Sequence, residues 1–278
     1  MTDPRDRRGV TNDRFLQVNR ARWDELVGIH AASDHYDVDG FTAGGTTLRD
    51  YEIEDVGDVA GKSLLHLQCH FGLDTLSWAR LGARVTGVDF SEKAIELGRS
   101  IAAETGLDST FVCSDVDSLP DNLTGEFDVV YTSRGVVNWL PDIERWGHVV
   151  AHFLQPGGIF YMTEGHPVLQ MFDHTPELKL RFPYFHRDVP DALVVPGTYA
   201  APGAEVKNQL ELGWSHGMGE IVTALAHAGL CLDFLREDPA GEWDRPFLET
   251  SGDGKWRYPP AKGEMPLWFS LKATKLAR

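Results

Sequence analysis

Two short apolar runs in the first half of the chain end in polar groups that a bound small molecule could reach. The run Leu64–Leu67 leads into the turn 68–72, and the run 85–88 ends at Asp89. A carboxylate at a strand end can accept hydrogen bonds from both hydroxyls of a ribose. Open α/β sheets bind their ligands at the carboxyl ends of their strands. The two segments therefore predict a site for an adenosine-containing cofactor.

The turn after the first run decides which cofactor fits. It reads Gln68-Cys69-His70-Phe71-Gly72, with a single glycine. A dinucleotide needs several glycines here, because backbone N–H groups must approach the pyrophosphate closely. The bulky turn thus argues against a pyrophosphate and favours a cofactor without phosphates, such as S-adenosylmethionine. A nicotinamide-dependent oxidoreductase is the weaker alternative.

The third run, Thr110–Ser114, leads into a further candidate contact. Asp115 could accept a hydrogen bond from an adenine amino group beside Val116, and Phe90 could stack on the adenine ring. Simpler roles are also open: Asp89 could cap the next helix, and Asp115 could be a solvated turn acid.

Five segments together resemble the class I S-adenosylmethionine-dependent methyltransferases over about residues 60–165. In chain order they are Leu65–Gly72, Val88–Ser91, Ser114–Val116, Phe127–Tyr131 and Leu154–Gly158. The family's loop usually has an acid where His66 stands and glycines where Gln68 and His70 stand. The resemblance implies cofactor contacts from Tyr36, Gln68, His70, Gly72, Asp89, Phe90, Asp115, Val116, Ser133 and Trp139.

The elements that must position these residues alternate between strand-length apolar runs and helix-length amphipathic runs. This is the pattern of a parallel sheet covered on both faces. Expected strands are Ser63–Leu67, Arg84–Asp89, Thr110–Ser114, Phe127–Thr132, Ile159–Thr163, Cys231–Leu235 and Leu267–Ala273. Expected helices are Leu73–Leu81, Glu92–Glu104, Ile143–Leu154 and one from Met218 to about Gly229, and Gln155–Gly158 is expected as a breaker. The predicted fold is α/β: a doubly wound, mostly parallel seven-stranded sheet of the Rossmann-like methyltransferase type, with an insertion after strand 5.

Four consecutive segments make up the predicted domain organisation. They are an N-terminal helix and lid segment (1–59), the cofactor-binding core (60–166), an insertion forming a substrate cover (167–213), and the last helix and two strands of the same domain (214–278). The first helix is expected to start at a cap, Asn12 or Asp13, after a loose stretch, and to end near Gly28.

The insertion is rich in proline and aromatic residues. Six of the fifteen prolines fall between Pro167 and Pro202, together with Tyr184, Phe185 and Tyr199. A long segment without regular structure inside a compact domain is usually a lid or binding loop. The segment is therefore expected to form most of an acceptor pocket.

Two histidines near the predicted sheet edge are candidate general bases. His166 follows the fifth strand and is the first candidate, and His216 is the second. A base within reach of an acceptor proton accelerates transfer by about 10²–10⁴-fold. The alternative for each is a capping or turn histidine. The eleven histidines form no Glu-x-x-His pattern, and no metal is expected, although an ion held by residues from distant segments stays open.

Charge and composition narrow the class of partner. The formal net charge is −16 (26 basic against 42 acidic residues), which disfavours nucleic acid and anionic membranes. Three scattered cysteines, and the lack of a signal-peptide pattern at the N-terminus, lead us to expect a cytoplasmic protein. The sequence thus favours O- or N-methylation of a small-molecule acceptor. A non-catalytic S-adenosylmethionine-binding protein is the alternative, and the motifs do not indicate an oligomeric state.

Overall fold

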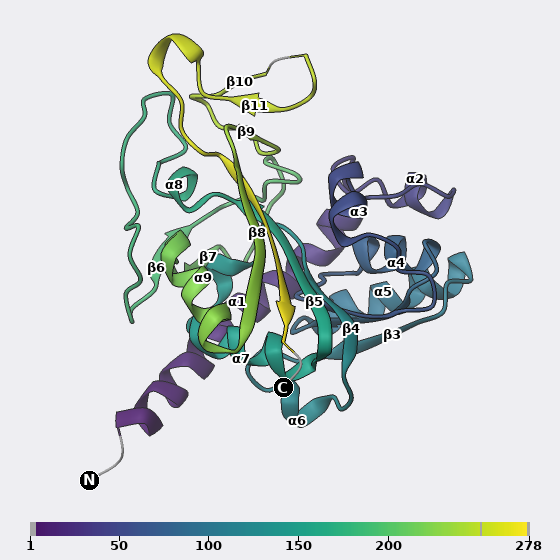
Figure 1. The fold of residues 1–278 in the computed structure, drawn as a ribbon. Helices are drawn as coiled ribbons and strands as arrows, with labels where there is room; N and C mark the ends of the chain where they lie inside the picture. Colours follow the sequence, from purple (N-terminus) through teal and green to yellow (C-terminus); the bar gives the residue numbers. More distant parts are fainter. Residues whose placement is uncertain (1–3, 251, 277–278) are drawn as a thin grey trace.

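A sheet of seven strands in the order β3-β2-β1-β4-β5-β12-β8 forms the centre of the computed structural model, which describes residues 4–250 and 252–276 (Figure 1). The strands are β1 (Ser63–Leu67), β2 (Arg84–Asp89), β3 (Ser109–Cys113), β4 (Phe127–Thr132), β5 (Leu154–Gly165), β8 (Leu230–Asp238) and β12 (Trp268–Lys275). Strands β1 to β5 are parallel, and β12 runs antiparallel to both of its neighbours. The predicted α/β fold with a mostly parallel, seven-stranded sheet is confirmed.

Helices cover both faces of the sheet. They are α3 (Asp50–Val56), α4 (Leu73–Arg80), α5 (Glu92–Thr105), α6 (Leu119–Asn122), α7 (Ile143–Phe153) and α9 (Met218–His227). Alternate side chains of β1 point to opposite faces, as the pleat requires. Leu64 packs in one cluster with Trp78 of α4, and Leu65 packs in another with Trp146 of α7. The two-sided burial explains why these strands read as continuous apolar runs.

The first helix is longer than the sequence indicated. Helix α1 spans Pro4–Ala31, so neither Asn12 nor Asp13 caps it, and the stretch expected to be loose is helical from Pro4 onward. Proline is favoured in the first turn of a helix, where its missing N–H is not needed. Residues 1–3 of that stretch lie outside the described residues. Two short helices follow, α2 (Val38–Thr42) and the already described α3.

The segment 167–213 contains more regular structure than expected. It begins with α8 (Pro167–Gln170), and it includes a two-stranded antiparallel sheet of β6 (Asp191–Val194) and β7 (Leu210–Gly213). The β6–β7 pair lies beside α1, and Asn19 of α1 exchanges two hydrogen bonds with the backbone of Leu212, at 2.8 and 3.0 Å.

Arg22 fixes this insertion to the first helix. Its side chain is 1% exposed, and its Nε donates to Glu211 Oε1 at 2.7 Å. Its other nitrogens donate to the backbone carbonyls of Val195, Asn208 and Gly197, at 3.1, 2.8 and 2.8 Å. A guanidinium stays charged in proteins, so its burial is tolerated only with such a complete set of partners.

Two further differences concern the end of the sheet. The residues Gln155–Gly158, expected as a breaker, lie inside β5. Phe127 pairs with Leu154 and Val129 with Ile159, so the register shifts there and Gly157 has a positive φ of 81°. A small sheet of β9 (Ala240–Gly241), β10 (Glu249–Thr250) and β11 (Trp256–Arg257) was not predicted, because two-residue strands leave no periodic pattern in the sequence.

The remaining elements are two 3-10 helices, η1 (Val137–Trp139) and η2 (Pro260–Lys262). None of the helices in the described part of the chain combines the length and apolar character needed to cross a bilayer.

Replacing Arg22 tests the attachment of the insertion. We expect Arg22→Met to lower the free energy of unfolding by about 3–5 kcal/mol, because it leaves Glu211 and three carbonyls without their donor. Urea unfolding measures the change, with the exposed Arg14→Met as the matched control. A loss below about 1 kcal/mol would show that the insertion is held mainly by other contacts.

Candidate active site

In the turn between β1 and α4, two residues other than glycine have left-handed backbone conformations. Gln68 and His70 have positive φ angles of 56° and 52°, and Gly72 has 76°. Left-handed backbone favours glycine, which is the residue that the methyltransferase loop usually has at the first two positions. A Cβ at Gly72 would collide with the ring of Phe111. Gly72 is thus required by core packing as well as by its φ angle, a reason that the sequence did not reveal.

Asp89 lies at the end of β2, beside this turn, as predicted. Its side chain accepts hydrogen bonds from the backbone N–H of His70 at 2.8 Å and of Ser91 at 2.9 Å. Burial raises the pKa of Asp89 to about 6, although these N–H groups oppose the shift. The N-cap of α5 is Ser91, whose hydroxyl accepts from Ala94 N. Asp89 therefore does not cap that helix, and it ties the turn to β2.

The residues expected near adenine have mixed environments. Asp115 accepts a hydrogen bond from Ser118 N at 2.9 Å, which is the turn role considered as the alternative. Val116 is buried in the hydrophobic core. Phe90 is half-buried, with the guanidinium of Arg20 5.9 Å from its ring centroid.

Aromatic and histidine side chains gather over the turn. Trp23 of α1 contacts His70, Trp139 and His30 edge to face, with ring centroids 5.3, 5.4 and 5.7 Å apart. Trp139 also donates its indole N–H to Gly135 O at 2.8 Å. The first helix thus meets two of the predicted cofactor residues, His70 and Trp139.

The insertion reaches the same cluster. Tyr36 stacks on His30, and its hydroxyl hydrogen-bonds that of Tyr199. His30 bonds His70 through Nδ1, at 3.0 Å, and Thr198 through Nε2, at 2.6 Å. Burial lowers the pKa of His30 to about 4 and that of His70 well below its usual value, so both rings are neutral near pH 7. Sequence reasoning missed His30 because its partners are distant in the chain.

His66 stands where the family loop usually has an acid. The fully buried ring bonds Thr75 Oγ1 at 2.8 Å and Ser133 Oγ at 3.1 Å. Burial lowers its pKa to about 4. A neutral ring therefore joins the ends of β1 and β4, and the Ser133 hydroxyl, expected to contact the cofactor, is engaged by it.

The geometry of the turn fits S-adenosylmethionine. The Gln68 Oε1 atom is buried and has no hydrogen-bond partner among the residues that the structure describes, while Gln68 Nε2 donates to Val136 O at 3.0 Å. This free acceptor suits the ammonium group of the cofactor's methionine part. Asp89 suits the ribose, and the two groups lie at adjacent strand ends.

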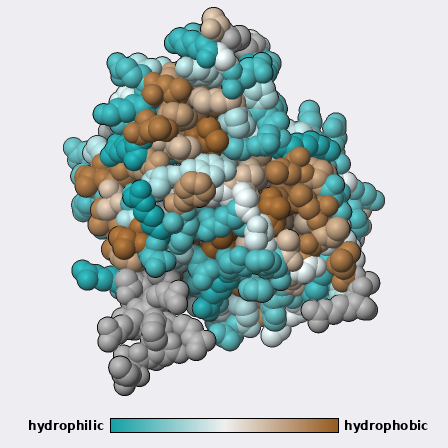
Figure 2. Space-filling model, turned by 60° about the vertical axis from the view of Figure 1, so that its left-hand side comes forward, coloured by the Kyte–Doolittle hydropathy of each residue, from teal (hydrophilic) through white to brown (hydrophobic). Residues whose placement is uncertain are grey.

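A cavity of about 230 Å³ lies next to this site. Its walls include Trp139, Glu164, Tyr184, Leu193, Trp214 and His216, from the core, the insertion and the start of α9. Figure 2 shows the side of the molecule that carries the insertion, with apolar residues gathered in separate patches among hydrophilic ones. Because Trp139 belongs to both the cavity and the aromatic cluster, the two sites adjoin each other.

Glu164 holds the wall between β4 and β5. Its carboxylate accepts from Gly135 N and Val136 N, both at 2.8 Å, from Val137 N at 3.3 Å and from Gly165 N at 2.7 Å. Burial raises its pKa despite these donors. The carboxylate oxygens accept from backbone N–H groups, so the role of Glu164 is to hold this wall of the cavity in position.

The two candidate bases differ in their environment. His166 is the N-cap of α8: its Nδ1 accepts from Val168 N at 3.1 Å, and its Nε2 donates to Glu237 Oε1 at 2.8 Å. With both nitrogens engaged, His166 takes the capping role, which argues against our first candidate. His216 lines the cavity, and only its Nε2 is bonded, to Leu140 O at 2.7 Å.

Comparisons with known proteins agree with this geometry. Residues 64–158 match the family model described as a methyltransferase domain, which includes the turn, Asp89 and Trp139. Residues 64–158 of this chain are thus similar to methyltransferase domains. The unpartnered Gln68 Oε1 and the carboxylate of Asp89 lie within this region.

Curated relatives are similar to this chain over part of their length. The ubiquinone biosynthesis O-methyltransferase of Photorhabdus laumondii is 32% identical over 114 residues, which are 41% of this chain and 47% of the relative. The enzyme of that name from Idiomarina loihiensis is 36% identical over 104 residues, or 37% and 42% of the two chains. The chain thus spans about half the length of the curated relatives it matches.

Solved structures share the fold of this chain. An S-adenosylmethionine-dependent methyltransferase from Clostridium acetobutylicum has a TM-score of 0.55 at 13% identity, covering 95% of this chain and 99% of that chain. One from Mesorhizobium loti has a TM-score of 0.53 at 19% identity, covering 80% and 94%.

Asp89 is the residue that tests the cofactor site. We expect Asp89→Ala to weaken S-adenosylhomocysteine binding by about 1–3 kcal/mol, because a charge-assisted contact to the ribose is lost. Asp89→Asn retains one acceptor oxygen and should lose less. Titration calorimetry measures both, with the exposed Glu96→Ala as control. Unchanged affinity in a folded Asp89→Ala protein would place the ribose elsewhere.

His66 makes folding stability depend on pH in a defined direction. Its pKa is about 4 in the folded protein and about 6.5 when unfolded. The unfolded chain therefore binds more protons between these values, and stability falls as the pH falls through them. From pH 7.5 to pH 5 the contribution lost is about 2 kcal/mol.

The His66→Gln variant should thus lose about 2 kcal/mol less than the wild type over this range. Urea unfolding at the two pH values measures the loss of stability in each protein. Subtracting one loss from the other removes the contributions of the titrating groups that both proteins share. His227→Gln, at an exposed position, should behave like the wild type. Equal losses in wild type and His66→Gln would mean that the ring is protonated when folded.

Proposed function

We propose that the protein transfers the methyl group of S-adenosylmethionine to a small-molecule acceptor held in the cavity beside Trp139. One observation carries the proposal: Trp139 forms a wall of the cavity and also packs in the cluster over the cofactor turn. An acceptor in the cavity would therefore lie next to the cofactor. The names of the curated relatives support an oxygen acceptor atom, that is, O-methylation.

The reaction needs little from the protein beyond placement. S-adenosylmethionine supplies an electrophilic methyl group, which an acceptor attacks in line. The chain contributes proximity, orientation and the exclusion of water. Asp89 and Gln68 would hold the two ends of the cofactor, and α1 with the insertion covers the sheet edge above them.

The acceptor side of the cavity offers one histidine with a free nitrogen. Nε2 of His216 donates to the Leu140 carbonyl, so in the neutral ring Nδ1 is the acceptor. We expect this group, and not His166, to act on the hydroxyl or amine of the acceptor. Glu164 keeps the opposite wall in place through its four backbone contacts.

Direct assay of methyl transfer tests the proposal. The full-length protein is incubated with methyl-labelled S-adenosylmethionine and a panel of small phenols, alcohols and amines, and labelled products are identified by mass spectrometry. Transfer to a panel member supports the proposal. Binding of S-adenosylhomocysteine without transfer would favour a non-catalytic binding protein, and binding of NAD alone would favour an oxidoreductase.

Enlarging a side chain that lines the cavity tests whether the acceptor binds there. Leu193 lines the cavity, whereas the next residue, Val194, points away from it and is 72% exposed. We expect Leu193→Trp to reduce methyl transfer at least tenfold, because it fills the acceptor space, while S-adenosylhomocysteine affinity stays within about threefold. Val194→Trp, on the same strand, should change neither. Full activity of Leu193→Trp would exclude this cavity as the acceptor site.

A further inference from the structure

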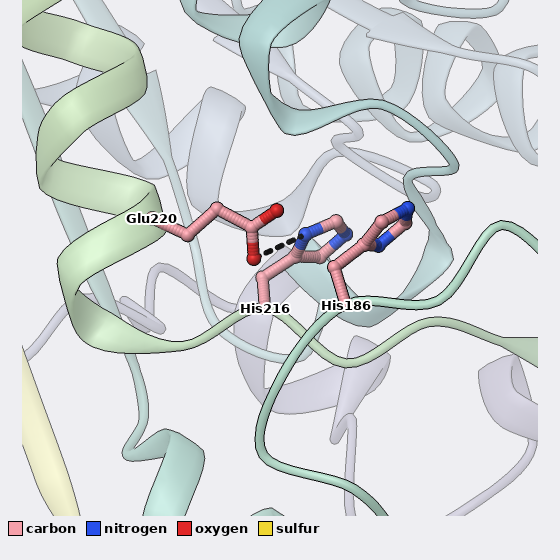
Figure 3. Close-up of side chains that lie close together, drawn as sticks. All are labelled: His186, His216 and Glu220. Atoms are coloured by element: carbon pink, nitrogen blue, oxygen red, sulfur yellow. Dashed lines mark ion pairs between the residues drawn. The ribbon is translucent and has the colours of Figure 1, made fainter.

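Three side chains from separate segments meet at one side of the cavity. His186 lies on the loop between α8 and β6, His216 precedes α9, and Glu220 is in the first turn of α9 (Figure 3). Each offers one donor atom, and these atoms lie within 4.8 Å of one another. His216 and Glu220 are only 4 positions apart, but His186 lies 30 positions before His216, so a local pattern could not reveal the whole group.

His216 presents an unsatisfied acceptor to this group. Its side chain is 1% exposed, and its Nδ1 finds no hydrogen-bond partner within residues 4–250 and 252–276. The bond from Nε2 to Leu140 O leaves the lone pair on Nδ1 in the neutral ring. That lone pair faces Glu220 Oε2 at 3.5 Å. In the neutral ring two acceptors thus face each other across this gap, an arrangement that a cation between them would stabilise, whereas a protonated ring would form an ion pair with Glu220 directly.

His186 adds a second nitrogen. Its ring stacks on that of His216, with centroids 5.0 Å apart and planes 13° apart. Its Nδ1 is also buried and without a hydrogen-bond partner in the described part of the chain. Since His186 lies on a loop, its ring can turn toward Glu220 without moving a helix or strand.

We propose that His186, His216 and Glu220 bind a divalent transition-metal ion such as Zn²⁺. Two imidazole nitrogens and one carboxylate oxygen form a ligand set that leaves a fourth position open. Donors about 2.0–2.2 Å from zinc lie roughly 3.3–3.5 Å apart at tetrahedral angles, close to the separation between His216 and Glu220. The Leu140 carbonyl on Nε2 is the outer contact that orients a ligating histidine.

With its Nδ1 on the ion, His216 would act on the acceptor through the metal and not as a free base, and the ion would give the cavity a binding preference. His216 lines the cavity, so an acceptor there can reach the open position. Zinc at such a position binds oxygen donors, and it lowers the pKa of a bound hydroxyl. The acceptor class would then be a small molecule with a hydroxyl or carboxylate oxygen, a refinement that rests on the proposed function. Binding of the ion itself does not depend on methyl transfer.

Metal binding is tested on the tag-free, full-length protein after removal of metals with EDTA. Titration calorimetry with Zn²⁺ alone should show one equivalent bound. Co²⁺ in its place should give the visible absorption of a tetrahedral site. We expect His186→Asn and Glu220→Gln each to weaken Zn²⁺ binding at least tenfold. Both side chains are partly exposed, so these variants should fold, which thermal unfolding checks.

A matched control is available on the same helix. His227 is an exposed residue of α9 that pairs with Glu144, and His227→Asn should bind Zn²⁺ as the wild type does. The proposal is overturned if the wild type shows no saturable binding, or if His186→Asn and Glu220→Gln bind Zn²⁺ normally. A protonated His216 at pH 7 in metal-free and zinc-treated protein, seen by NMR, would identify an imidazolium–carboxylate pair and overturn it as well.

The two proposals can fail separately. Zinc binding that requires these residues, in a protein that transfers no methyl group, would leave the metal site intact and remove the proposed function. Methyl transfer that is unaffected by EDTA, in a protein that binds no Zn²⁺, would do the reverse.

Discussion

The positions of the first helix and of residues 195–211 depend on one constraint, the buried guanidinium of Arg22. It cannot lose its charge, and its donors are matched only when residues 195–211 lie against α1. Trp23 and His30 of the same helix then meet the cofactor turn, and Thr198 and Tyr199 meet His30. One satisfied charge thus places the first helix and the insertion as a single cover over the sheet edge.

Below the cover, buried carboxylates at strand ends keep the loops in position. Asp89 holds the turn after β1, and Glu164 holds the loop after β4. Burial raises both pKa values, whereas the backbone N–H groups stabilise the charged forms. The cofactor turn and the cavity are linked through Trp139, which belongs to the aromatic cluster and to the cavity wall. They are also linked through the backbone of Val136, which bonds both Gln68 and Glu164.

The parts that the sequence predicted depend on local patterns. Apolar runs buried on both faces define β1 to β4 within about one residue, and the acid expected at a strand end, Asp89, is the last residue of β2. The insertion was expected, but its hairpin was not, because Arg22 and Glu211 are 189 positions apart. The same holds for His30 with Thr198 and for His186 with Glu220. Contacts of this kind leave no periodic signal, so spacing motifs cannot report them.

Sequence and structure together explain why this chain has Gln68 and His70 where relatives of its fold usually have glycine. Each left-handed residue costs on the order of 1–2 kcal/mol. Glycine would avoid that cost, but it has no side chain to bond Val136 O or His30. Through these bonds the turn is joined to the β4 loop on one side and to α1 and Thr198 on the other. The strain is therefore offset by contacts that link the cofactor turn to its cover, so that opening the cover must also disturb the turn.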